Sequence, residues 1–140
     1  MHRPIFATVM LLTATLAACA TTSTQSRETL LDNTLESYAA TLRWGNFADA
    51  RQFLAPKYRK AHPLSPLDLA RYRQVQVSWY HDSPAVPVNA MEVTQTVEIG
   101  LVNVNTQAAR SIVDHQVWRY DEAAKHWWLM SGLPDITHHE

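Results

Sequence analysis

The sequence predicts an α+β protein in which N-terminal helices pack on one face of a curved antiparallel sheet of about four strands. Two observations carry this prediction. Apolar residues recur with helical spacing in the first half of the chain, and they alternate with polar residues over long stretches of the second half. Helices therefore come first and strands follow, an order that is typical of α+β folds.

The first element is a helix that begins near residue 27. Its apolar side chains recur at i, i+4, i+7 and i+11 and so share one helical face, which consists of Leu31, Leu35, Tyr38 and Leu42. Ser26 has the side chain of a good N-cap. Gly45 is placed to end the helix in the left-handed conformation that glycine adopts at low cost.

A second, shorter helix is expected immediately afterwards. Asn46 and Asp49 form a capping pair at its start, and its apolar face consists of Phe47, Ala50, Phe53 and Leu54. Pro56 is expected to close it. Residues 57–66 then form a loop, after which the cap and first-turn pair Ser65-Pro66 predicts one helical turn through Leu69.

Strands follow from residue 72 onward. The first alternates apolar and polar residues around Val75, Val77 and Trp79, and prolines at 84 and 87 interrupt it. A long second strand covers 91–101, where Gly100 suggests a bulge or a sharp bend. A turn around 105–107 leads into a third strand, 108–120, and a turn at 121–125 leads into a fourth, 126–131.

The composition excludes several classes of protein. The chain of 140 residues has 12 Lys+Arg and 13 Asp+Glu, and this net charge of −1 offers no electrostatic reason to bind nucleic acid. One cysteine excludes an internal disulfide and a multi-cysteine metal site. No glycine-rich phosphate motif is present, and the terminal His138-His139-Glu140 lacks the further ligands of a metal site. We therefore expect neither a metal nor a cofactor.

The amino terminus has the pattern of a secretory signal. A short basic start precedes an uncharged apolar run that ends near Ala18 and is short for a membrane-spanning helix. Leu16-Ala17-Ala18-Cys19 resembles a bacterial lipobox. The resemblance implies cleavage after Ala18, a diacylglyceryl thioether on Cys19 and a third acyl chain on the new amino terminus. The alternative is an ordinary signal peptide with a chance cysteine.

The chain then divides into four segments. Residues 1–18 form the signal peptide, 19–26 the lipidated cysteine and a flexible tether, 27–136 a single domain and 137–140 a tail. Several buried acyl chains hold a protein stably at a bilayer. Ala20 stands where aspartate signals retention at the inner membrane in enterobacteria, so the expected location is the periplasmic side of the outer membrane.

Two stretches resemble a known superfamily. The helix–glycine–helix pattern of residues 42–56 and the closing hairpin of residues 117–129 are similar to those of nuclear-transport-factor-two-like (SnoaL-like) domains. The resemblance implies a cone-shaped domain whose curved sheet wraps a pocket lined by the first helix. Members of that superfamily include isomerases, dehydratases and domains that only bind ligands or dimerise, so the fold alone assigns no activity.

An isomerase or dehydratase would need a general base and a hydrogen-bond donor in that pocket. The candidate bases are His115 and Asp114, and the candidate donor is Tyr38. A three-residue turn before the third strand pairs Val97 with His115, whereas a two-residue turn pairs Val97 with Asp114. Adjacent strand residues face opposite sides of a sheet, so only one candidate base faces the pocket. The alternative is a polar residue at the pocket mouth or in solvent.

Other residues are candidates for binding. The candidate pocket residues are Tyr38, Trp44, Trp79, Gln95 and His115. The tryptophans either stack on a flat ligand or belong to the core. With the three-residue turn, the outer face of the third strand carries a candidate partner interface made of Ile112, Trp118 and Tyr120.

Between residues 51 and 73, six basic residues stand against one acid, Asp68. This stretch either meets anionic lipid headgroups or forms a solvated face. The function expected from the sequence is that of a non-enzymatic envelope lipoprotein that binds a small apolar ligand or a protein partner, including a second copy. The alternatives are an isomerase or dehydratase and a structural subunit of an envelope complex.

Overall fold

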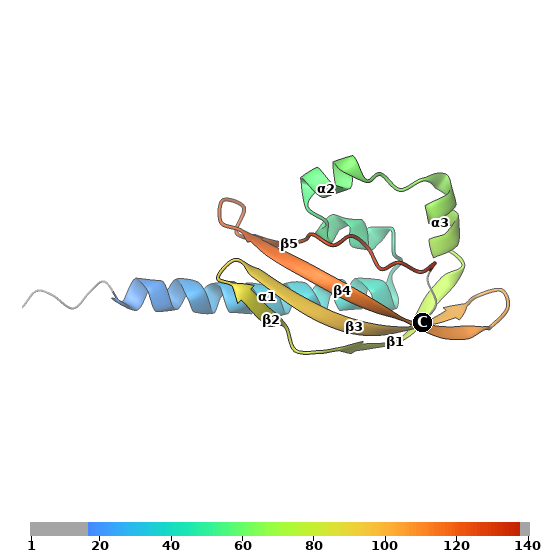
Figure 1. The fold of residues 1–140 in the computed structure, drawn as a ribbon, viewed down its shortest axis with the longest axis horizontal. Coiled ribbons are helices and arrows are strands. Elements are labelled where there is room, and N and C mark those ends of the chain that lie inside the picture. Colours follow the sequence, from blue (N-terminus) through green and yellow to red (C-terminus); the bar gives the residue numbers. More distant parts are fainter. Residues whose placement is uncertain (1–16, 138–140) are drawn as a thin grey trace, which may run out of the picture.

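The computed structural model describes residues 17–137, so most of the predicted signal peptide and residues 138–140 lie outside the described residues. A curled antiparallel sheet packs against helices (Figure 1), which confirms the predicted α+β class. In chain order the elements are α1 (Ala17–Trp44), the 3₁₀ helix η1 (Asp49–Phe53), α2 (Pro56–Ala61), α3 (Pro66–Tyr72), β1 (Val75–Asp82), β2 (Val86–Asn89), β3 (Glu92–Asn103), β4 (Ala109–Asp121) and β5 (His126–Leu129).

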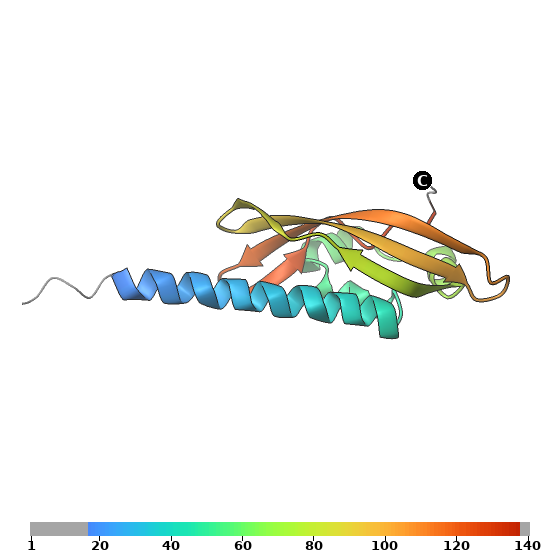
Figure 2. The same ribbon diagram turned by 90° about the horizontal axis from the view of Figure 1, so that it is seen from below.

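The first helix is longer than the sequence pattern predicts. It begins at Ala17, so Ser26 lies inside it rather than capping it, and the predicted tether of residues 20–26 is helical rather than flexible. Neither glycine nor proline occurs between residues 17 and 44, so no residue of this segment interrupts the helix. The 28 residues span about 42 Å. The N-terminal turns of α1 extend beyond the sheet (Figures 1 and 2).

The short helices follow local capping chemistry. The Asn46 amide donates to the Asp49 carboxylate at 2.6 Å, and the Asp49 backbone N–H donates back to the Asn46 side chain at 3.0 Å. This predicted pair leads into a 3₁₀ helix. Pro56 opens α2 instead of ending the preceding helix, because proline suits a first helical turn. Ser65 caps α3 in a capping box with Asp68, and α3 continues past the predicted end to Tyr72.

The sheet has the strand order β1-β3-β4-β5, and β2 pairs with β3 beyond the end of β1. Sequence reasoning missed β2 because Pro84 and Pro87 interrupt its pattern. Proline is tolerated in β2 because this strand lies at the edge of the sheet. On the far edge, the Ala55 backbone N–H donates to the Leu129 carbonyl at 3.1 Å and ties the chain before α2 to β5.

The β3–β4 register decides which side chains face inward. Val97 lies opposite Asp114, and Gln95 lies opposite Gln116, as the two-residue-turn alternative predicts. The connection is longer, because four residues lie between Asn103 and Ala108, whose backbones are hydrogen-bonded at 2.9 Å. Gln107 in this loop has a positive φ of 60°. An even number of loop residues preserves the same pairing, so alternate residues from Ile112 to Tyr120 face the interior.

The hollow of the curved sheet is filled by the protein's own side chains. Tyr38 from α1 packs edge-on against Phe53 and Trp118, with ring centroids 5.4 and 5.2 Å apart. Tyr38 and Trp118 are both 0% exposed. After β5, the chain returns across the domain, where Ile136 is buried and its carbonyl accepts a hydrogen bond from Arg110. The core therefore includes both ends of the domain.

A bulge in β1 turns one aromatic residue outward. Val77 pairs with Leu101, but Trp79 pairs with Gly100, so Ser78 is an extra residue. The extra residue reverses the alternation, and Trp79 covers Gly100 on the outer face while Tyr80 and Asp82 turn inward. A Cβ on Gly100 would overlap the indole nitrogen of Trp79. The absence of a side chain at position 100 is what allows the indole to lie on the sheet.

We expect Gly100→Ala to lower the free energy of unfolding by about 1–3 kcal/mol, because the added methyl group displaces the indole. Trp79→Ala removes the obstacle, so Gly100→Ala should cost much less in that background. Chemical denaturation of the four chains of this double-mutant cycle measures the coupling. Equal costs of Gly100→Ala in both backgrounds would show that Trp79 is not the constraint.

Candidate functional site

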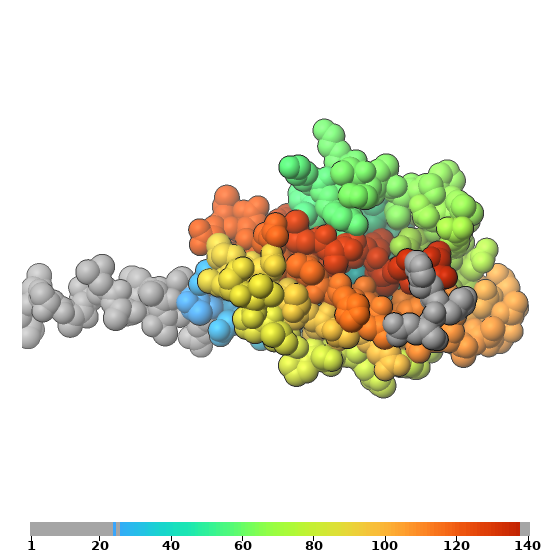
Figure 3. All heavy atoms as spheres, in the orientation of Figure 1, coloured from blue at the N-terminus to red at the C-terminus, as the bar shows by residue number. Residues whose placement is uncertain are grey.

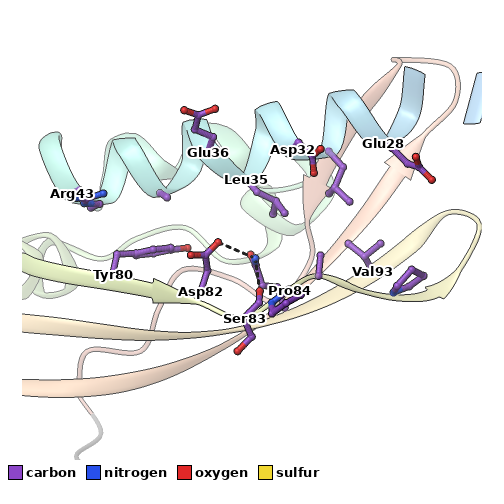
Figure 4. A pocket seen from close by; sticks show the side chains of 15 residues that line it. Glu28, Asp32, Leu35, Glu36, Arg43, Tyr80, Asp82, Ser83, Pro84 and Val93 are labelled. Atoms are coloured by element: carbon purple, nitrogen blue, oxygen red, sulfur yellow. Dashed lines mark hydrogen bonds between the residues drawn. The ribbon is translucent and has the colours of Figure 1, made fainter. Parts of the chain in front are cut away.

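A cleft lies between α1 and the β1–β2 edge of the sheet (Figure 4). This α1–β2 cleft has a volume of about 800 Å³ and is open to solvent. It is lined by Glu28, Leu31, Asp32, Leu35, Glu36, Ala39 and Arg43 of α1, by Tyr80 and Asp82 of β1, by Ser83, Pro84, Ala85 and Pro87, and by Val93 and Gln95 of β3.

One wall of the cleft is acidic. Glu28, Asp32 and Glu36 recur every four residues, so they form a stripe along one side of α1, here called the acidic stripe. Asp82 adds a fourth carboxylate, and Arg43 is the one basic residue in the lining. Asp68 pairs with Arg71, and Glu92 pairs with Arg119, so neither of these ion pairs neutralises the acidic stripe.

The floor of the cleft is apolar and rigidly held. Leu31, Leu35 and Ala39 lie on the side of α1 next to the acidic stripe and face the sheet. Gln95 is 5% exposed. Its side-chain amide donates to the Ser83 carbonyl at 2.9 Å and to the Asp82 carboxylate at 3.4 Å. These hydrogen bonds fix the connection between β1 and β2, which forms the second wall.

A polar network lies deeper, on the inward face of β4. The Trp118 indole N–H donates to the Gln116 side-chain oxygen at 3.0 Å. The Gln116 amide nitrogen donates to Asp114 Oδ2 at 2.8 Å and to the Tyr80 hydroxyl at 3.2 Å. Gln116 therefore holds the carboxylate in place between a tyrosine and the aromatic core.

Burial controls the electrostatics of this network. It raises the pKa of Asp114 from 3.8 to about 6, although the hydrogen bond from Gln116 and the nearby His115 act in the opposite direction. Burial also raises the pKa of Tyr38 well above its ordinary value, with Asp114 adding to the effect. The Tyr38 hydroxyl is buried without a hydrogen-bond partner. An ionised Asp114 is thus an unfavourable charge in the folded protein.

We expect Asp114→Asn to remove a pH dependence of stability. Because the folded carboxyl binds its proton more tightly than the unfolded one, the free energy of unfolding falls as pH rises from about 4 to about 6. The loss amounts to at most about 3 kcal/mol. Denaturation at pH 4 and pH 8 should show a smaller decrease in the variant than in the wild type. The interpretation fails if both chains lose stability equally over this interval.

The structure separates the residues that the sequence grouped as pocket candidates. Gln95 lines the cleft, whereas Tyr38 is sealed in the core. Trp44 ends α1 with 79% of its surface exposed and lies against Arg43. Trp79 is on the outer face because of the bulge. The expected grouping of these five residues around one pocket is therefore wrong.

The proposed pairing of His115 with Tyr38 is also wrong. His115 lies opposite Thr96 on the outer face, is exposed and contacts the Thr96 hydroxyl at 3.2 Å. Asp114 is the candidate base that faces the interior. The expected outer interface is wrong for the same reason, because this register buries Ile112, Trp118 and Tyr120.

Sequence reasoning missed the acidic stripe. Its signal was present in the i, i+4, i+8 spacing of Glu28, Asp32 and Glu36, next to the apolar positions of the same helix. This spacing was not sufficient to predict a site, because an acidic face of a helix is usually only exposed to solvent. Residues 82–87 form the opposite wall of the cleft. Their prolines interrupt the strand pattern, so this wall was not predicted.

The chain matches no known protein-family model, and no curated protein is significantly similar to it. Among the described residues, no helix is long and apolar enough to cross a membrane. Within residues 17–137, no group of three or more His, Cys, Asp or Glu side chains is arranged to hold a metal ion.

Proposed function

We propose that this chain is a lipid-anchored, non-catalytic protein-binding module of a bacterial envelope and that the α1–β2 cleft is its docking surface. The filled hollow of the sheet carries the proposal. Tyr38, Phe53 and Trp118 occupy the space that a cone-shaped domain would offer to a small apolar ligand. The open, acidic cleft instead suits a partner that brings its own basic surface.

The anchor half of the proposal rests on the lipobox-like residues and on the course of α1. Arg27 is where α1 meets the sheet: its guanidinium donates to Met91 Sδ at 3.3 Å and lies 5.9 Å from the Tyr120 ring centroid. The Trp127 indole N–H donates to the Arg27 carbonyl at 3.0 Å. The helical rise places Arg27 about 12 Å from residue 19 along the axis. Lipid on Cys19 would therefore hold the domain on a short helical spacer.

The anchor is tested by feeding cells radiolabelled palmitate. We expect the wild type to be labelled and to fractionate with the outer membrane, and Cys19→Ser to lose both properties, because the thiol is the acyl acceptor. Ser26→Ala is the matched control and should keep them. Equal labelling of wild type and Cys19→Ser would remove the lipid from the proposal.

The choice of protein binding over small-ligand binding is tested by thermal unfolding. We expect indole and a medium-chain fatty acid to leave the Tm of the wild type unchanged, because the hollow has no room for either. Phe53→Ala, which opens a cavity beside Tyr38, is the positive control, and indole should raise its Tm. A saturable rise in the wild-type Tm would instead support a small apolar ligand.

An isomerase or dehydratase is the second candidate, and one observation favours it. Asp114 faces the interior on the same side as Tyr38, and burial raises its pKa to about 6, as a general base requires. However, Asp114 is 8% exposed. It does not line the α1–β2 cleft or any of four smaller clefts among the described residues. A substrate bound in one of these clefts would not contact it, so we favour the binding function.

A further inference from the structure

We propose that the partner that occupies the α1–β2 cleft is a second copy of this chain, which inserts the basic surface formed by α2 and α3. This inference rests on the proposed function and names its partner. It joins two features that the fold leaves unused, an acidic cleft on one edge of the molecule and a basic projection on the other.

The basic face consists of Lys57 and Lys60 on α2, Arg71 on α3 and Arg73 directly after it. All four side chains are exposed. Lys57 and Lys60 are three residues apart and so share one side of α2. Asp68 is the one acid between residues 51 and 73, and it already lies 3.9 Å from Arg71. The face therefore keeps a strong positive excess.

The two surfaces also match in their apolar residues. Leu67 on α3 is 58% exposed beside the basic face, and the cleft has apolar lining residues of its own in Leu35, Ala85 and Pro87. Apolar surface of this kind is what an interface core requires, while charges at its rim set orientation and partner choice. Each surface thus combines apolar residues with an excess of charge, and the two charges are opposite in sign.

The positions of the two surfaces make the contact one between copies. In Figure 1, α2 and α3 lie along the upper edge of the molecule and β1 and β2 along the lower edge. Figure 2 views the β1–β2 edge with α2 and α3 behind it, and the α2 region projects from the upper edge in Figure 3. One chain cannot fold its own α2 into its own cleft. A copy placed alongside can supply it.

Such a contact is head-to-tail, because it joins two different surfaces, and it can repeat from copy to copy. Stacking along the vertical direction of Figure 1 leaves every α1 parallel, with its N-terminus at the same end. All copies in a row can then keep their anchors in one membrane. Exposed ion pairs contribute only about 0.2–1 kcal/mol each, so the contact is weak in dilute solution. Confinement to a membrane raises the effective concentration and favours it.

Zero-length carbodiimide cross-linking tests the contact directly, because the reagent joins only lysines and carboxylates that touch. Two differently tagged copies of the full chain are co-expressed, and their membranes are treated at low salt and at 1 M salt. We expect links between copies from Lys57 or Lys60 to Glu28, Asp32 or Glu36, and their loss at 1 M salt, where the screening length falls to about 3 Å. An absence of such links overturns the proposal.

Charge reversal separates this contact from other effects. We expect Asp32→Lys with Glu36→Lys, and separately Lys57→Glu with Lys60→Glu, each to reduce self-association at least fivefold in the tagged pull-down. The chain that carries all four reversals should regain it, because both surfaces change sign together. Glu98→Lys on the outer face and Lys125→Glu in the β4–β5 turn are matched controls that should have no effect.

Failure of rescue by the fourfold reversal, or links from the cleft to a different protein, overturns the inference that a second copy is the partner. Neither result bears on the two measurements that test the proposed function. These are palmitate labelling and the Tm of the wild type with and without indole or the fatty acid. Conversely, loss of labelling in the wild type refutes the anchor while the cross-links can persist. The two proposals therefore fail on different measurements.

Discussion

The pairing of β3 with β4 is the constraint on which the rest of the structure depends. A shift by one residue would place His115 in the interior and turn Asp114, Gln116 and Trp118 to solvent. In the observed register, Trp118 meets Tyr38 from the opposite layer, and Gln116 connects the indole to a buried carboxylate. The filled hollow, the raised pKa of Asp114 and the burial of Ile112, Trp118 and Tyr120 all follow from this one alignment.

Filling the hollow also decides where a partner can bind. Because aromatic side chains occupy the space under the sheet, α1 lies against them along Tyr38 and Leu42. The acidic stripe lies on an exposed side of the same helix, across from the connection between β1 and β2. The surface that we propose for binding is therefore at the edge of the molecule rather than in its interior, and its shape depends on the connection that Gln95 holds.

Much of this fold follows from local patterns in the sequence. The period of Leu31, Tyr38 and Leu42 locates α1, the capping residues Asn46 and Ser65 locate two further turns, and alternation locates β3 and β4. The start of α1 could not be placed, because Ser26 has the chemistry of a cap and only the absence of a helix breaker argues against it. The strand register was open, since loops of two and four residues give the same pairing and a loop of three gives the other.

The site was harder to predict than the fold because it depends on contacts between distant segments. Gln95 occupies a position that alternation along its strand places with the apolar residues, and it lines the cleft. Alternation places Trp79 with the apolar residues of β1 in the same way. Trp79 nevertheless lies on the outer face of the sheet, because the bulge at Ser78 reverses the alternation. Nothing local to Ser78 marks the bulge, and the signal is Gly100 on the partner strand. The acidic stripe likewise becomes a cleft only when residues 82–87 lie across from it.

The helical conformation of residues 20–26 within α1 has a mechanical consequence. Seven unstructured residues would form a flexible tether and let the domain reorient freely above its attachment point. A helix is a stiff spacer, which couples the orientation of the domain to that of its attached end and keeps the sheet at one height. With lipid at its end, such a spacer would confine the domain to a shallow layer and present the same edge to every neighbour, so that collisions in the plane occur between surfaces already turned toward each other.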